Sequence, residues 1–372
     1  MILSTFNGAA LRLARAFQGR TLEELAERAG KTRQFLHKIE TGQAVPGTEL
    51  VELLAAIVHV EPRFFYDPAS SPIAEEEFHF RRLFTSRMPV KQLAMAKAEV
   101  FVRLVAVLEK RLKMPALNIP TVDDVATADD IEKAAELCRE HWGLGNGPIS
   151  NMMRLAENQG AIITMFHSIS KEVDALSVFR GRPVIVRNDA KESTCRLRFD
   201  IAHELGHAVL HRGVPTGDRF TESQAHRFAG ALLIPRAMMT KLFPRMRGSH
   251  IDWRALSQFK LTWKLSKAAI IYRARELDLI TEQQFRSGVI TLKRCGEAIS
   301  EREDSSIPRE EPELLKQAIA VLESQGITIA SVASELHVRP EFLEEFVGNL
   351  GYMAPTRTAE IIQFSQLRKI AG

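Results

Sequence analysis

The most constraining feature of the sequence is a pair of histidines four residues apart, with a glutamate directly after the first. His203, Glu204 and His207 form the pattern H-E-x-x-H inside the stretch 198–211, which has helical periodicity. In a helix, histidines at this spacing lie one turn apart on one face, so both imidazoles can bind a single metal ion. Glu204 would lie beside that ion, where a general base is needed. The pattern therefore predicts a helix that carries a metal site, with Zn²⁺ as the expected cofactor.

A third protein ligand is expected downstream, because a catalytic zinc site has three protein ligands and one open position. Glu222 lies 15 residues after His207, at the start of a second helical pattern that ends at Pro235. His226 follows one turn later on the same face and is predicted to orient a ligand or to take part in catalysis. The alternative is that Glu222 is a solvated carboxylate in a first helical turn and that His226 only packs at an interface.

Three short segments rich in branched and aromatic residues precede the metal motif. They are Ala161–Phe166, Leu176–Phe179 and Pro183–Val186, and they predict a small β-sheet beside the metal helix. The edge of such a sheet can take an extended peptide as an additional strand. The alternative, that the strands only support the fold, is compatible with this role.

The N-terminal region predicts a second function, binding of double-stranded DNA. Residues 21–30 have the pattern of a capped helix, and a second helix is expected from Thr32 to Glu40. Amide and basic side chains on such a helix can reach base edges and phosphates in the major groove. The candidate DNA contacts are Thr32, Arg33, Gln34, His37 and Lys38. A protein-docking role for the same unit is the alternative.

On these residues the chain resembles the ImmA/IrrE family of zinc-dependent metallo-endopeptidases, fused to an XRE-type helix-turn-helix. The resemblance rests on R-x-R-F-x-x-A-H-E-L-G-H-x-x-L-H over 196–211, on E-x-x-A-x-x-F-A-x-x-L-L-x-P over 222–235, and on residues 8–66. It implies that His203, His207 and Glu222 bind zinc and that Glu204 is the catalytic base. Two residues depart from the family pattern, since Gln224 stands where many members have Glu and His226 replaces the usual Asn or Asp.

The expected fold is mainly α with a small β-sheet, an α+β class. It comprises an XRE-type five-helix domain at 1–66, a linker and basic connector helix at 67–115, and a minimal zincin-like peptidase domain at 116–245. A helical extension at 246–300 follows, and then a linker and a trihelical module at 301–372. That module is inferred from an internal echo, because residues 328–343 repeat the residue spacing of 21–36. Its acidic second helix favours protein contact over DNA contact.

Composition agrees with a folded chain of several cores. The protein has 372 residues, a net charge of +4 and only three cysteines, which fits a reducing compartment. No apolar run long enough to cross a membrane and no N-terminal signal segment are expected, so the predicted location is cytoplasmic with no membrane partner. The fold also permits a homodimer on a palindromic DNA site.

The leading hypothesis is a transcriptional regulator with zinc-dependent endopeptidase activity. The family resemblance implies a protein substrate, either a transcription factor or an antitoxin, that is cut in a stress or phage response. The alternative is a non-proteolytic repressor or antitoxin-like regulator whose zinc site is structural or sensory. The two hypotheses differ in the fourth coordination position, which is open in a peptidase and closed in a structural site.

Overall fold

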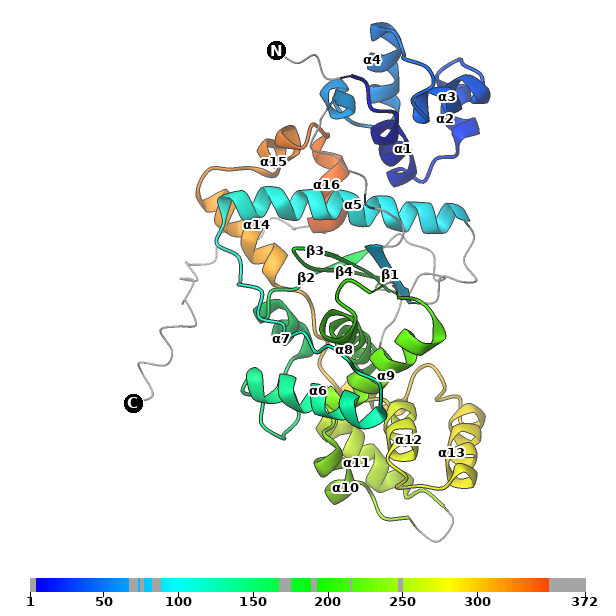
Figure 1. Ribbon diagram of the computed structural model, residues 1–372, viewed down its shortest axis with the longest axis vertical. Coiled ribbons are helices and arrows are strands. Elements are labelled where there is room, and N and C mark those ends of the chain that lie inside the picture. Colours follow the sequence, from blue (N-terminus) through cyan, green and yellow to red (C-terminus); the bar gives the residue numbers. More distant parts are fainter. Residues whose placement is uncertain are drawn as a thin grey trace.

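The computed structural model describes residues 5–66, 73, 77–81, 88–166, 175–188, 193–214, 216–246 and 250–347. Helices predominate, and a small sheet lies in the middle of the molecule (Figure 1). This confirms the predicted α+β class, in which the helix-turn-helix unit precedes the unit that carries the metal motif. No helix among the described residues has both the length and the apolarity needed to cross a membrane.

The N-terminal bundle has four α-helices and one 3₁₀ helix where five helices are predicted. They are α1 (Gly8–Phe17), α2 (Leu22–Arg28), α3 (Arg33–Glu40), α4 (Thr48–Ile57) and the 3₁₀ helix η1 (Pro62–Tyr66). Thr21 and Glu24 form the expected capping box at the start of α2. The buried Arg15 guanidinium donates two hydrogen bonds to the Glu40 carboxylate, at 2.6 and 3.0 Å. This ion pair fixes α3 against α1.

The sheet has four strands in the order β1-β3-β4-β2. They are β1 (Phe78–Arg81), β2 (Ile162–Phe166), β3 (Ala175–Arg180) and β4 (Arg182–Asn188). β3 pairs antiparallel with β1 and β4, and β2 pairs parallel with β4. The last three strands in chain order coincide with the predicted segments.

Strand β1 corrects the expectation that Phe78–Arg81 leads directly from a linker into the connector helix. These four residues are too few to show a strand periodicity of their own, and their pairing partner lies about a hundred residues further along the chain. Most of the predicted linker, residues 67–72 and 74–76, lies outside the described residues.

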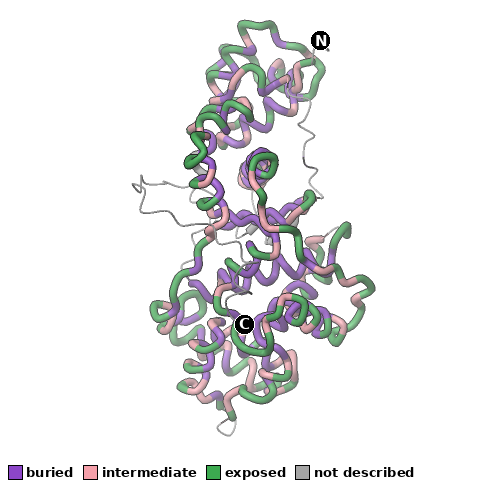
Figure 2. The backbone as a smooth tube through the Cα atoms, turned by 90° about the vertical axis from the view of Figure 1, so that its left-hand side faces the viewer, coloured by how far each residue is buried: buried purple, intermediate pink, exposed green. Residues whose placement is uncertain are grey.

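Different helices cover the two faces of the sheet. The long helix α5 (Met88–Arg111), the predicted connector helix, packs on one face with Val178, Val184 and Val186 (Figure 1). The helix of the metal motif, α8 (Thr194–Leu210), lies on the other face with Ile163 and Ile185. The sheet is therefore buried on both sides, and much of its backbone belongs to buried residues (Figure 2).

A second core is built from helices around α8. Its other members are α6 (Ala128–His141), α7 (Met152–Asn158), α9 (Arg219–Leu233), α10 (Arg236–Leu242), α11 (Trp253–Trp263), α12 (Lys267–Glu276) and α13 (Glu282–Arg294). Lys264 has a left-handed backbone, with φ of 53°, between α11 and α12. Helix α9 packs along α8.

The C-terminal helices return to the N-terminal half of the molecule. After the 3₁₀ helix η4 (Arg302–Ser306) come α14 (Leu314–Ser324), α15 (Ile329–Glu335) and α16 (Pro340–Val347). They lie along α5, and both α14 and α16 contact β2 (Figure 1). The Phe342 ring stacks on the Phe17 ring of α1 with centroids 3.8 Å apart. These helices thus share one hydrophobic core with the N-terminal bundle and α5.

Candidate functional site

Three side chains converge at the site predicted to bind metal. His203 and His207 lie one turn apart on α8, and Glu222 reaches them from the first turn of α9. The Nε2 atoms of the two histidines are 3.2 Å apart. The Glu222 carboxylate oxygens lie 3.3 Å from Nε2 of His203 and 3.2 Å from Nε2 of His207. Among the described residues this is the cluster whose donor atoms could hold a metal ion, all within 4.8 Å of one another.

These separations fit a tetrahedral zinc ion. With zinc bonds of about 2.0 to 2.1 Å to nitrogen and oxygen, two ligand atoms of a tetrahedron lie roughly 3.3 Å apart. The two histidine nitrogens are therefore spaced as two corners of such a tetrahedron, and each lies at a similar distance from one oxygen of the Glu222 carboxylate. A set of two imidazoles and one carboxylate is also the donor chemistry of a catalytic zinc site.

A hydrogen-bond chain fixes the protonation of His207. Gln224 donates through Nε2 to the backbone oxygen of Val125 at 2.9 Å, so its Oε1 must accept from Nε2 of His211, also at 2.9 Å. Burial lowers the pKa of His211, which therefore stays neutral and accepts through Nδ1. The proton in the 3.0 Å contact between the Nδ1 atoms of His207 and His211 thus belongs to His207. The lone pair on His207 Nε2 is left facing the site, as a metal ligand requires.

The Glu222 side chain is ionised in this environment. Burial raises its pKa, but the interactions of the carboxylate with the His203 and His207 imidazoles outweigh burial and hold the pKa well below its ordinary value. The side chain keeps 29% of its surface exposed, whereas the two histidine side chains keep 2 to 3%. The carboxylate is therefore the member of the cluster nearest to solvent.

The candidate base Glu204 is held by a residue that the sequence reasoning missed. The Ser177 hydroxyl of β3 donates a short hydrogen bond to Oε2 of Glu204. Both side chains are buried, with Glu204 1% and Ser177 0% exposed. The available signal was a polar residue in an otherwise apolar strand, since a buried hydroxyl needs a partner.

His226 lies one turn further along α9, between two aromatic rings. Its ring centroid is 4.7 Å from that of Phe199 on α8 and 5.3 Å from that of Tyr272 on α12. Tyr272 is 48% exposed. The sequence motifs contain no tyrosine, so the presence of this phenol beside His226 emerges only from the packing of α12.

The predicted DNA contacts all lie on one exposed helix. Thr32 caps α3 by accepting from the backbone N–H of Phe35 at 3.2 Å. Arg33, Gln34, His37 and Lys38 are exposed on α3, while Leu36 and Ile39 are buried in the bundle. An apolar inner face and a basic, amide-bearing outer face are what a recognition helix requires.

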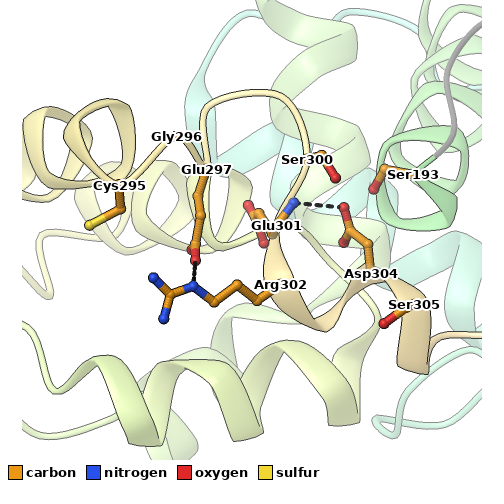
Figure 3. A pocket seen from close by; sticks show the side chains of 9 residues that line it. All are labelled: Ser193, Cys295, Gly296, Glu297, Ser300, Glu301, Arg302, Asp304 and Ser305. Atoms are coloured by element: carbon orange, nitrogen blue, oxygen red, sulfur yellow. Dashed lines mark hydrogen bonds and ion pairs between the residues drawn. The ribbon is translucent and has the colours of Figure 1, made fainter.

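A polar pocket of about 570 Å³ lies at the opposite end of α8 from His211, next to Ser193 (Figure 3). Its acidic lining is neutralised from within the protein. Buried Lys260 binds Glu301 at 2.7 Å, and Lys267 binds Glu297 at 2.6 Å. None of the predicted site residues is among its lining residues, so the pocket is separate from the metal cluster.

Two comparisons with known families agree with this geometry. Residues 158–275 match the peptidase M78 family described as the IrrE N-terminal-like domain, and residues 8–63 match a helix-turn-helix domain. The predicted fusion is therefore confirmed: the chain joins a helix-turn-helix domain to a metallopeptidase-like domain. No curated protein matches the chain.

Proposed function

We propose that this chain is a DNA-binding transcriptional regulator with zinc-dependent endopeptidase activity. Its substrate would be a partner regulator protein, a transcription factor or an antitoxin, that is cut in a stress or phage response. The observation that carries the proposal is the convergence of His203, His207 and Glu222, with donor atoms 3.2 to 3.3 Å apart, on the helix that also bears Glu204.

In this proposal the three converging side chains hold zinc and Glu204 moves the proton. When bound, zinc would supply the Lewis acidity that polarises a peptide carbonyl and a water molecule. The Glu204 carboxylate, oriented by Ser177, accepts a proton from the attacking water and later passes it to the nitrogen of the leaving amine. His226, one turn after Glu222 on α9, and Tyr272, whose ring is 5.3 Å from that of His226, are the candidates to stabilise the developing oxyanion.

The regulatory part of the proposal is supported by the N-terminal domain. A helix-turn-helix domain at residues 8–63 favours double-stranded DNA as a partner and the cytoplasm as the place of action. A two-fold dimer on a palindromic site remains part of the prediction.

The peptidase is tested by separating metal binding from catalysis. Zinc content and cleavage are measured for the wild type, Glu204→Gln and His203→Ala, using purified proteins encoded beside this gene as candidate substrates. We expect Glu204→Gln to keep one zinc ion per chain and to lose cleavage by about 100-fold or more. His203→Ala should lose both. Equal turnover by the wild type and Glu204→Gln would overturn the assignment.

DNA binding is tested independently of the metal. Gln34→Ala and Lys38→Ala remove exposed candidate contacts to a base edge and to a phosphate. Loss of the amide should relax sequence preference at one base pair, at about 1 to 3 kcal/mol. Loss of the lysine should weaken binding to all DNA sequences by a similar factor and should reduce the salt dependence of the affinity. Unchanged binding by both variants would assign α3 to protein docking.

The burial of Glu204 favours a second candidate, a regulator that does not cleave. A base that is 1% exposed is closed to an external peptide in the conformation described here. In that case the zinc site would be structural or sensory. A zinc-loaded chain that binds DNA but shows no cleavage would support this alternative. The same result is required when strand β1, which pairs with β3 next to Ser177, is displaced by mutation.

A further inference from the structure

Strand β1 occupies the edge of the sheet that lies beside the candidate base. β4 pairs with one edge of β3, and β1 pairs antiparallel with the other. In this pairing His79 is opposite Ser177, the residue that donates to Glu204. Paired residues on neighbouring strands are about 5 Å apart. The β1 backbone therefore passes directly beside the residue that holds Glu204.

This strand comes from outside the metallopeptidase-like domain. The family match begins at residue 158, and the helix-turn-helix match ends at residue 63. β1 at Phe78–Arg81 belongs to the connection between them. It is thus an addition to the sheet from this chain's own connecting segment.

Two side-chain contacts hold the start of β1 in place. Arg180 at the end of β3 donates from two nitrogens to the two oxygens of Glu77, each at 2.7 Å. The next residue, Phe78, is 4% exposed and belongs to the same hydrophobic core as Val178. Further upstream, the Ile73 N–H donates to Glu99 of α5 at 3.4 Å. An acidic residue followed by an aromatic residue is therefore what this sheet edge accepts.

We infer that the edge of β3 on which β1 lies is the strand-binding site for substrate and that β1 fills it as an internal, substrate-like strand. The inference rests on the proposed function and names a substrate class: an extended segment in which an acidic residue precedes an aromatic one. Arg180 would bind the acidic side chain of the substrate. The buried site that Phe78 occupies would bind the aromatic side chain. An extended peptide that pairs with a sheet edge gains affinity from its backbone and specificity from its side chains.

In this arrangement β1 blocks the substrate site, so the enzyme would be inactive until β1 is displaced. A tethered segment competes at an effective concentration on the order of millimolar. An external peptide at micromolar concentration can therefore pair with β3 only when β1 has dissociated from it. Glu204 and Ser177 are both buried while β1 is paired with β3.

The first test measures peptide binding without zinc, in the Glu204→Gln chain. The probe is a fluorescent peptide that copies residues 73–82, and binding is followed by anisotropy. Opening the edge with Glu77→Arg in the protein should tighten binding at least tenfold, because the peptide still offers its own glutamate to Arg180. Arg180→Glu should bind this peptide weakly but bind a charge-swapped peptide, with arginine in place of that glutamate, at least tenfold better.

A matched control removes another exposed ion pair. Glu282→Arg breaks the contacts of Glu282 with Arg275 on α12 and with Arg286 on α13, and it should leave peptide affinity unchanged. Equal affinity of all variants for both peptides would overturn the inference.

The second test locks the strand reversibly. Arg81→Cys with Ala175→Cys places two thiols at a paired position of β1 and β3, in a Cys295→Ser background that removes the exposed native thiol. Oxidation should lower peptide affinity at least tenfold, and a reductant should restore it. Equal peptide affinity of the disulfide-bonded and the reduced chain would also overturn the inference.

These outcomes are separate from those of the peptidase test. A chain that follows the binding pattern yet cleaves nothing when loaded with zinc would refute the peptidase and keep the strand site. A chain that cleaves while all binding variants behave alike would keep the peptidase and refute the strand site.

Discussion

At the scale of single residues, hydrogen bonds behind the candidate metal site orient one of its proposed ligands. His211 and Gln224 do not face the cluster, yet together they decide which nitrogen of His207 carries the proton. Outer partners of this kind fix the ring orientation of a ligand and its affinity for metal. Gln224, which departs from the family pattern, is therefore an integral part of the site.

Gln224→Ala should weaken zinc binding. The substitution removes the acceptor of the His211 proton, so His211 can change tautomer and the His207 ring loses its fixed orientation. We expect zinc affinity to fall by about 10-fold to 100-fold. Competition with a chromophoric chelator measures it. Gln283→Ala, at an exposed position on α13, is the control, and equal affinity in the two variants would contradict the role assigned to Gln224.

Spacing along the chain predicted the metal cluster but not its surroundings. The identity of His203, His207 and Glu222 follows from helical geometry and one chain reversal, which are local properties. Ser177 and Tyr272 join the site through the packing of β3 on α8 and of α12 on α9. Such contacts depend on how elements assemble, which periodicity does not encode.

At the scale of elements, the close packing of α8 and α9 brings Glu222 to the histidines. Gly206 lies between His203 and His207 on α8 and faces α9. A Cβ atom at this position would lie 3.0 Å from a ring carbon of Phe228 and 3.2 Å from the backbone of Ala225. The absence of a side chain at Gly206 therefore sets the distance between the two helices.

Gly206→Ala should damage both stability and metal binding. The helices must move apart to admit the methyl group, and overpacking of a close-packed core costs about 1 to 3 kcal/mol. The same movement draws Glu222 away from the histidines. Urea unfolding and zinc titration measure the two effects. Gly147→Ala meets no atom within 4 Å and is the control; a Gly206→Ala chain with normal zinc affinity would show that Glu222 is positioned by other contacts.

The start of helix α2 was marked in the sequence, whereas strand β1 was not. Thr21 is a capping residue that signals the helix start locally. β1 has no such marks, because four residues gain their structure from pairing with β3. The sequence could show that a sheet edge was available, but not that the chain supplies its own strand there.

At the scale of the whole molecule, the C-terminal helices α15 and α16 repeat α2 and α3 of the N-terminal bundle. α15 and α16 begin 307 residues after α2 and α3 and have the same lengths. Like α3, which buries Leu36 and Ile39, α16 buries its apolar face, with Phe342 against Phe17 and Phe346 against Phe101. The echo in the sequence predicted the helices, while their covering partners depended on the assembled fold.

Two buried glutamates connect these C-terminal helices to the metallopeptidase-like half. Glu310 accepts from the backbone N–H of Met152 at 2.7 Å, at the start of α7, and forms a short ion pair with Arg198 on α8. Glu157, at the end of α7, accepts from the N–H groups of Glu313 and Leu314 at 3.1 Å. The segment that the sequence suggested as a linker is thus fixed to the helix of the metal motif.

Glu157 should make the stability of the whole assembly depend on pH. Burial raises the pKa of Glu157 from its ordinary value of 4.5 to about 7. Between these values the folded chain holds a proton that the unfolded chain has lost, so the free energy of unfolding falls as pH rises from about 4.5 to about 7. The loss is on the order of 3 kcal/mol.

Glu157→Gln should remove this loss, because an amide stays neutral at every pH and can still accept the N–H of Glu313. Urea unfolding, followed by tryptophan fluorescence at pH 5 and pH 8, measures the difference between the two chains. Relative to the wild type, the variant should gain stability at the higher pH, whereas Glu52→Gln, at an exposed position on α4, should not. If the wild type and Glu157→Gln lose stability equally over this range, the carboxyl is ionised throughout, and its bonds to the start of α14 are those of a charged group.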